Sequence, residues 1–186
     1  TTQNPIIVNG YVLIEMQTSV MKFLFMNGNG GNYMGVRSTI IYGYGFMDIF
    51  TTDEIANFIK NHKEAFCKSA KEFELYDKVL KYTNAEELED DFYMSGYECD
   101  NFSATGIRVA ISNIMSRETG IKFQYEEGGD GYSSPMIMLA ECMPWYYNDI
   151  EKKLTEKSLR DICIKYAKEL GADKSSVDYQ EVEYYY

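Results

Sequence analysis

The order of strand-like and helical patterns along this 186-residue chain constrains its fold more than any other feature. Near the start, residues 6–8 and 11–14 are β-prone and flank Asn9-Gly10, the strongest short-range signal for a two-residue hairpin turn. Further β-prone stretches lie at 21–26 and 33–50. The first 50 residues are therefore predicted to form mostly antiparallel sheet.

The middle of the chain changes to helical patterns. Thr51 and Glu54 have the spacing of a capping box, and the apolar residues that follow, from Ile55 to Phe66, recur at helical period. A helix is therefore predicted to begin here. Further helices are predicted at 75–81, at 84–92 with Asn84 as the cap, at 104–117 before Gly120, and from Thr155 to Leu170 before Gly171.

Strand patterns return in the last third of the chain. Residues 121–125 and 135–140 flank a glycine-rich turn at 128–131 and predict a second hairpin, while 177–186 predicts a terminal strand. Gly43 and Gly45, inside an earlier strand, predict either a bulge or a close approach of another backbone. This order of elements predicts an α+β fold, with antiparallel sheet and several helices in the middle and near the C-terminus, in a single domain over 1–186.

Composition excludes several classes of protein. Apolar residues make up 45% of the chain and aromatic residues 15%, so the chain carries enough hydrophobic surface to fold. Its four cysteines lie far apart without a C-x-x-C pair, and only one histidine could join them, which argues against a zinc site and predicts no cofactor. No signal peptide precedes the first strand, and no apolar run reaches the roughly 18 residues of a membrane span. We therefore expect a cytoplasmic protein, in a reducing compartment, that does not bind membranes.

The most informative feature for function is a long acidic segment. Between Lys81 and Arg108 the chain carries seven carboxylates and no Lys or Arg, within a protein whose formal net charge is -11. Such a surface repels nucleic acid and attracts basic surfaces. On a helix, Glu86 with Asp90 places like charges one turn apart, which costs a few tenths of a kcal/mol. A surface selected only for stability would avoid this cost.

We expect this acidic segment, together with two tyrosines beside it, to bind a basic partner. Carboxylates one turn apart along a helix are separated by roughly 6 Å, which is close to the spacing of phosphates along a nucleic-acid strand, so they can imitate its backbone. The alternative is an exposed helix face that is kept polar for solubility. The predicted partner-binding residues are Glu86, Glu87, Glu89, Asp90, Asp91, Tyr93, Tyr97, Glu98 and Asp100.

Three other groups of residues could carry chemistry, and each has a simpler interpretation. The glycines from Gly28 to Gly35 fit neither G-x-G-x-x-G nor a P-loop, which favours a hairpin loop over a phosphate site. His62 is the only histidine and lies beside the apolar stripe of its helix, which favours a structural role over a catalytic one. Five acidic residues could bind Ca²⁺ or Mg²⁺ but match no EF-hand loop, which favours solvated loops; they are Glu98, Asp100, Glu126, Glu127 and Asp130.

In general character the chain resembles anti-CRISPR proteins of type II systems, which are small, acidic, tyrosine-rich inhibitors of host defence. The resemblance rests on the sequence Glu86-Glu-Leu-Glu-Asp-Asp91 and on a chain without a catalytic motif. It implies a non-enzymatic inhibitor that binds the Arg- and Lys-lined DNA channel of an RNA-guided nuclease, with or without its guide RNA. It also implies that the protein blocks target DNA binding or cleavage and does not itself bind nucleic acid.

Two other functions stay open from the sequence. An immunity or antirestriction protein would use the same acidic surface against another basic nuclease. A small carboxylate-dependent enzyme would need two carboxylates at a defined separation in space, which a sequence does not report.

Overall fold

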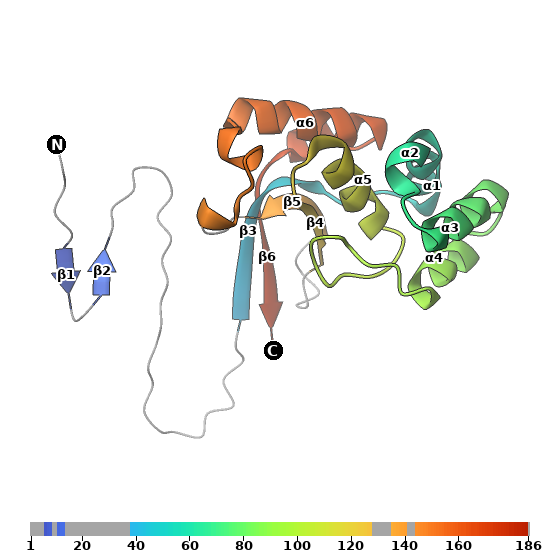
Figure 1. Ribbon diagram of the computed structural model, residues 1–186, viewed down its shortest axis with the longest axis horizontal. Coiled ribbons are helices and arrows are strands. Elements are labelled where there is room, and N and C mark those ends of the chain that lie inside the picture. The colour runs from blue at the N-terminus through green and yellow to red at the C-terminus, as the bar shows by residue number, and fades with distance from the viewer. Residues whose placement is uncertain (1–5, 9–10, 14–37, 128–134, 141–143, 186) are drawn as a thin grey trace, which may run out of the picture. The chain divides into compact units, whose positions relative to one another are not determined.

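The structure of the protein is a computed structural model that describes residues 6–8, 11–13, 38–127, 135–140 and 144–185 (Figure 1). The chain divides into two compact units, Thr1–Gly35 and Val36–Tyr186, which we describe separately. The prediction of a single domain over 1–186 stays a prediction.

The first unit contains the predicted hairpin. Strand β1 (Ile6–Val8) pairs antiparallel with β2 (Tyr11–Leu13), and Val8 lies opposite Tyr11. This pairing confirms the two predicted strands. The turn Asn9-Gly10, the predicted strand at 21–26 and the loop Gly28–Gly35 lie outside the described residues.

The second unit contains a four-stranded antiparallel sheet. Strand β3 (Ser38–Met47) pairs with β5 (Met136–Ala140) on one side and with β6 (Asp178–Tyr185) on the other. Strand β4 (Phe123–Glu126) pairs with β5, so the order across the sheet is β4-β5-β3-β6. The predicted pairing of 121–125 with 135–140 is therefore confirmed.

Most helices of the second unit follow β3 and precede β4 in the sequence. The α-helices are α1 (Thr52–Asn61), α2 (Lys63–Phe66), α3 (Ala70–Lys81), α4 (Ala85–Met94), α5 (Val109–Thr119) and α6 (Glu156–Glu169). The described part of the chain also contains three short 3-10 helices, at Pro144–Tyr146, Glu151–Lys153 and Lys174–Ser176. An antiparallel sheet with its helices grouped in the middle and near the end confirms the predicted α+β class.

Local capping signals placed several helix ends correctly. Thr51 and Glu54 form the predicted capping box at α1. The Asn84 side chain accepts a hydrogen bond from the backbone N–H of Glu86 at 3.0 Å and caps α4, as predicted. Helix α5 ends at Gly120, whose φ of +72° is left-handed, which is the usual geometry of a glycine stop.

Three helix boundaries differ from the predictions by more than two residues. The predicted helix over 51–66 ends at Asn61, and Lys63–Phe66 form the separate turn α2. Helix α3 begins at Ala70 instead of 75, because the Ser69 side chain caps it. Helix α5 begins at Val109 instead of 104, because Thr105 forms a β-bridge with Glu98.

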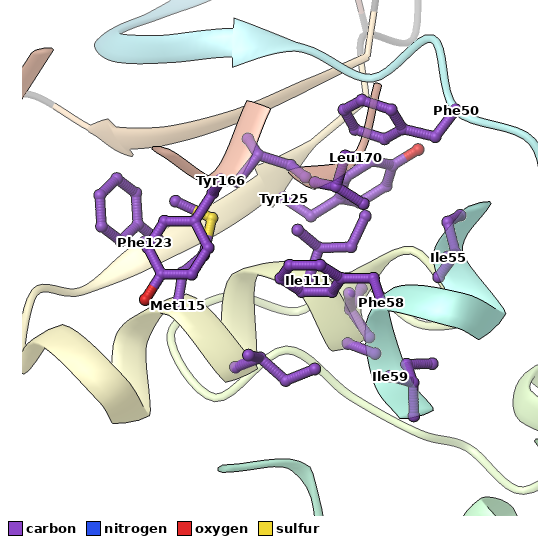
Figure 2. Packing of buried hydrophobic residues seen from close by; sticks show 14 of the residues in the cluster. Phe50, Ile55, Phe58, Ile59, Ile111, Met115, Phe123, Tyr125, Tyr166 and Leu170 are labelled. Atoms are coloured by element: carbon purple, nitrogen blue, oxygen red, sulfur yellow. The ribbon is translucent and has the colours of Figure 1, made fainter. Parts of the chain in front are cut away.

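The main core lies between one face of the sheet and helices α1, α5 and α6 (Figure 2). Phe58 of α1, Ile111 and Met115 of α5, Phe123 of β4 and Tyr166 of α6 are all buried in this cluster. The rings of Phe58 and Tyr166 meet edge to face with centroids 6.1 Å apart. Helix α5 is buried from Val109 to Met115, so it is the central helix of the layer.

The opposite face of the sheet carries a smaller apolar cluster over the two glycines of β3. Met138 of β5 is fully buried there. A Cβ at Gly45 would lie 1.9 Å from the carbonyl oxygen of Ile137, and one at Gly43 would lie 2.5 Å from the sulfur of Met138. The register between β3 and β5 runs without interruption from Gly43 to Met47. The glycines therefore serve a close backbone approach, which was one of the two predicted alternatives.

We predict that Gly45→Ala lowers the free energy of unfolding by about 3 kcal/mol, because a methyl group would overlap the backbone of β5 and force the two strands apart. Gly96→Ala is the matched control: Gly96 has a φ of +60° and nothing within 4 Å of an added Cβ, so only conformational strain of about 1 kcal/mol is expected. Urea unfolding of both variants measures the difference. Equal losses of unfolding free energy in the two variants would show that the close approach of β5 does not prevent a side chain at Gly45.

Candidate partner-binding surface

The predicted acidic segment forms α4 and the loop that leads towards α5. Glu86, Glu87, Asp90, Glu98 and Asp100 are exposed, while Glu89 and Asp91 are partly buried. In Figure 1, α4 lies beside α3, on the side of the second unit away from β3 and β6. The carboxylates are thus concentrated on one helix and one adjoining loop.

Three of the seven carboxylates are neutralised by cations from other segments. Glu89 lies 3.2 Å from Arg108, and Asp91 lies 2.6 Å from Lys78 of α3. Asp100 makes two contacts with Arg117 of α5, at 2.7 and 3.0 Å. Helix α4 has no basic residue of its own that could pair with its carboxylates. For these three carboxylates the cation comes instead from α3 or from the region of α5.

The remaining carboxylates have no ion-pair partner in the described part of the chain. Glu86, Asp90 and Tyr93 lie four and three residues apart and so share one face of α4, with Glu87 beside them. The side chain of Tyr93 is 66% exposed. We call Glu86, Glu87, Asp90 and Tyr93 the α4 surface. It combines three uncompensated negative charges with one exposed aromatic ring.

Tyr97 does not belong to this surface, and its predicted role as an exposed aromatic anchor is wrong. Its side chain is only 3% exposed and packs against Phe66 and Phe92, with ring centroids 5.6 and 5.5 Å away. Its hydroxyl accepts a hydrogen bond from Asn113 at 3.0 Å. Burial raises the pKa of this hydroxyl, so it stays neutral. Tyr97 anchors the loop after α4 to the core.

Among the described residues of the second unit, Arg117 forms the most highly connected ion-pair centre. Besides Asp100, its guanidinium lies 2.7 Å from the buried Glu72 of α3 and donates to the carbonyls of Ala65 and Phe66, at 3.2 and 2.8 Å. Burial lowers the pKa of Arg117, but the carboxylates of Asp100 and Glu72 outweigh it and raise the pKa above its ordinary value. The guanidinium is therefore permanently charged and joins α2, α3, α5 and the acidic loop.

A cleft of about 450 Å³ opens beside the α4 surface. It is walled by Glu89, Asp90 and Tyr93 of α4, by the segment from Thr105 to Arg108, by Asp48 after β3, and by Tyr125 and Glu127 at the end of β4. Four carboxylates and one arginine thus line the cleft. The cleft continues the negative surface of α4 into a hollow.

Asp48 is the most deeply buried charged group of this cleft. Its side chain has no exposed surface. One carboxylate oxygen accepts from the backbone N–H of Phe50 at 3.3 Å, and the other lies 3.1 Å from Nε of Arg108 without receiving a hydrogen bond in the described residues. Burial raises the pKa of Asp48, and the charge of Arg108 opposes this only in part.

His62 cross-links three helices. Its Nδ1 lies 2.7 Å from Glu118 of α5 and its Nε2 lies 2.8 Å from Glu169 of α6, while its ring lies against Phe58 with centroids 4.3 Å apart. Both ring nitrogens are engaged by carboxylates, so neither is available to act as a base on a substrate. This geometry agrees with the structural role that the sequence favoured.

The candidate cation ligands are not brought together. Asp100 is bound by Arg117, Glu126 is fully buried and accepts from Gln124 at 2.5 Å, and Asp130 lies outside the described residues. Among the residues that the structure describes, no three His, Cys, Asp or Glu side chains form a group that could hold a metal ion.

Comparison with known proteins assigns no family: no protein-family model, curated protein or solved structure matches this chain. Across the described ranges, no helix combines the length and apolar character that crossing a membrane requires.

Sequence reasoning missed Asp48, Arg108 and Arg117. The two arginines lie 19 and 17 residues from Glu89 and Asp100, so no local pattern joins the partners. The sequence did contain one indication. Arg108 precedes a strongly apolar helix and Arg117 lies in its last turn, and a cation in such surroundings needs a carboxylate nearby.

We predict that Arg117→Lys lowers the free energy of unfolding by about 3 kcal/mol, because an ammonium group cannot contact Asp100, Glu72 and two carbonyls together and leaves buried acceptors unpaired. The control is Lys78→Met, which breaks the partly exposed pair with Asp91 and should cost less than about 1 kcal/mol. Chemical denaturation compares the two variants. Similar losses would refute a central role for Arg117.

A second prediction concerns acid stability. Partial burial raises the pKa of Glu118, but hydrogen bonds from Tyr166 and His62 outweigh it and hold the pKa below its ordinary value of 4.5. Ionised Glu118 therefore stabilises the fold above that value, and the contribution is lost as pH falls through the folded-state pKa. Glu118→Gln should cost about 1 kcal/mol near neutral pH and much less at about pH 3.

Urea unfolding at both pH values measures this dependence. Glu64→Gln, which removes an exposed carboxylate of α2, is the control and should change stability little at either pH. A Glu118→Gln penalty that stays constant between the two conditions would contradict the prediction.

Proposed function

We propose that this protein is a non-enzymatic inhibitor of the anti-CRISPR kind, which binds a type II RNA-guided nuclease through the α4 surface and blocks target DNA binding or cleavage. The observation that carries the proposal is the set of three carboxylates on α4, Glu86, Glu87 and Asp90, that have no ion-pair partner among the described residues. Other carboxylates of the same segment are neutralised, so charge compensation is within reach of this fold.

Asp90 is the uncompensated charge that opposes helix stability, whereas Glu86 and Glu87 lie in the first turn of α4, where the helix dipole favours carboxylates. Glu86 and Asp90 repel each other across one turn. The last turn of α4 holds no basic residue, although the negative end of the helix dipole favours a cation there. Intermolecular contact with a basic surface would relieve both effects. This favours a role in binding over a role in solubility.

The composition of the α4 surface also suits an interface. Tyr93 is an exposed amphipathic ring, and the neighbouring Met94 is 80% exposed. Aromatic and methionine side chains are enriched at protein interfaces, where they supply apolar contact, while the surrounding charges steer association. A net charge of -11 adds long-range attraction to any cationic cleft.

The basic partner that best fits these features is a protein whose own ligand is a polyanion. The heteroduplex channel and the short-motif reader of an RNA-guided nuclease are lined with Arg and Lys. Carboxylates on α4 would compete with DNA phosphates for these side chains. Inhibition would then result from occupancy alone, without a chemical step.

We predict that the triple substitution Glu86→Lys, Glu87→Lys, Asp90→Lys leaves the protein folded and weakens inhibition of target cleavage by at least about 100-fold, because like charges across an interface cost several kcal/mol. The measurement is target-DNA cleavage by a panel of purified type II nucleases with their guide RNAs. The loss should shrink as salt rises, since charges are screened beyond roughly 8 Å at physiological ionic strength.

The matched control is Glu156→Lys, Asp161→Lys, Glu181→Lys. It reverses three exposed acidic residues of α6 and β6, and so changes the net charge equally. Its inhibition should stay within a few-fold of the parent protein. Full inhibition by the folded α4 variant would refute the α4 surface and direct attention to Trp145 and Tyr146, which are 69% and 65% exposed. Inhibition of a restriction endonuclease, with no effect on the panel, would favour the antirestriction alternative.

A further inference from the structure

We infer that the cleft between α4 and the end of β4 is a receptor for one arginine side chain of the partner. This inference rests on the proposed function, because the arginine is taken to come from the basic surface that α4 approaches. The cleft adjoins the α4 surface through Asp90 and Tyr93, which belong to both. A partner held by α4 therefore brings its side chains to the mouth of this hollow.

The charge balance of the cleft favours a cationic occupant. Asp48, Glu89, Asp90 and Glu127 contribute four negative charges to its walls when ionised, against the single positive charge of Arg108. The three nitrogens of the Arg108 guanidinium are already engaged, at 3.1 Å by Asp48, at 3.2 Å by Glu89 and at 3.3 Å by the carbonyl of Phe50. Asp90 and Glu127 are exposed and have no cation within the described chain.

A buried acceptor at the base of the cleft points to a missing donor. The carboxylate oxygen of Asp48 that faces Arg108 is buried and forms an ion pair with Nε of Arg108 at 3.1 Å, but no donor in the described residues meets it with hydrogen-bond geometry. An acceptor left in this state carries a desolvation penalty that a further donor would remove. A side chain that enters with several N–H groups could supply one while its remaining donors contact Asp90 and Glu127.

The walls suit arginine better than lysine. A guanidinium is planar, carries five donors and is weakly hydrated, so it can bind two carboxylates and lie against an aromatic ring at once. Tyr93 offers an exposed ring at the cleft. Burial raises the pKa of Tyr125, which therefore stays a neutral wall and donates its hydroxyl to Glu127 at 3.3 Å.

The same fold already binds an arginine in this way. Arg117 is held by both oxygens of Asp100, by Glu72 and by two backbone carbonyls. Paired carboxylates on the loop and helices of this unit thus form a working guanidinium site within the chain. The cleft is also lined by several carboxylates, and two of them, Asp90 and Glu127, are exposed to solvent.

The test is titration of ¹⁵N-labelled protein with acetylated, amidated Gly-Arg-Gly and, separately, Gly-Lys-Gly, followed by amide NMR shifts. We expect saturable shifts concentrated at Tyr93, Gly106 and Glu127, and binding of the arginine peptide about fivefold tighter than the lysine peptide. Asp90→Asn with Glu127→Gln should weaken arginine binding about tenfold, equivalent to 1.4 kcal/mol. Glu86→Gln with Glu87→Gln, which removes the same charge from α4 outside the cleft, should change it less than about twofold.

Shifts spread evenly over the acidic surface, equal affinity for the two peptides, or equal losses in the two double variants would overturn the inference. The nuclease assay, run on the same variants, separates this inference from the proposed function. If the variant Asp90→Asn with Glu127→Gln no longer binds the arginine peptide but still inhibits the nuclease, only the arginine receptor is refuted. Cleft occupancy without inhibition of any type II nuclease refutes the proposed target, and leaves an arginine receptor for another basic partner.

Discussion

The second unit depends on two arginines at opposite ends of one buried helix. Arg108 precedes α5 and Arg117 lies in its last turn, while the residues between them pack into the core. Arg108 contacts Asp48 after β3 and Glu89 of α4, and Arg117 contacts Glu72 of α3 and the loop residue Asp100. Apolar packing between the helices and the sheet is non-directional, so it is compatible with several helix arrangements. These ion pairs form only when the helices take one particular arrangement around the sheet.

Elements controlled by neighbouring residues could be predicted from the sequence. The capping box at Thr51, the cap at Asn84 and the stop at Gly120 each depend on interactions within a few residues, and each was placed correctly. Boundaries controlled by distant contacts were not. The bridge between Thr105 and Glu98 keeps helix α5 from starting at 104, and no periodic pattern reports it. Likewise, a sequence does not show that β6 pairs with β3, because the two strands are far apart in the chain.

The acidic segment was correctly recognised as largely exposed, but not all its members have the same role. Helical spacing of Leu88 and Phe92 predicts which side of α4 is buried, and these two residues are indeed in the core. Beyond the helix the period gives no guidance, so Tyr97 could be taken for a surface residue although it packs against Phe66 and Phe92. The division between paired and unpaired carboxylates was also hidden, because the cations come from other segments. The sequence thus located the surface, and only the structure separated its binding candidates from its internal ion pairs.

The internal contacts of α4 have a consequence for its outward side chains. Glu89 accepts from the hydroxyl of Thr52 and contacts Arg108, and Asp91 contacts Lys78, so the helix is fastened to α1, α3 and the start of α5 by the residues on either side of Asp90. These contacts restrict the backbone at Asp90, so little further conformational entropy would be lost on binding a partner. The helix is preorganised, and the entropy that association must usually overcome has already been lost during folding. In the proposed complex, this surface would favour slow dissociation over fast exchange, since the bound geometry is also the resting one.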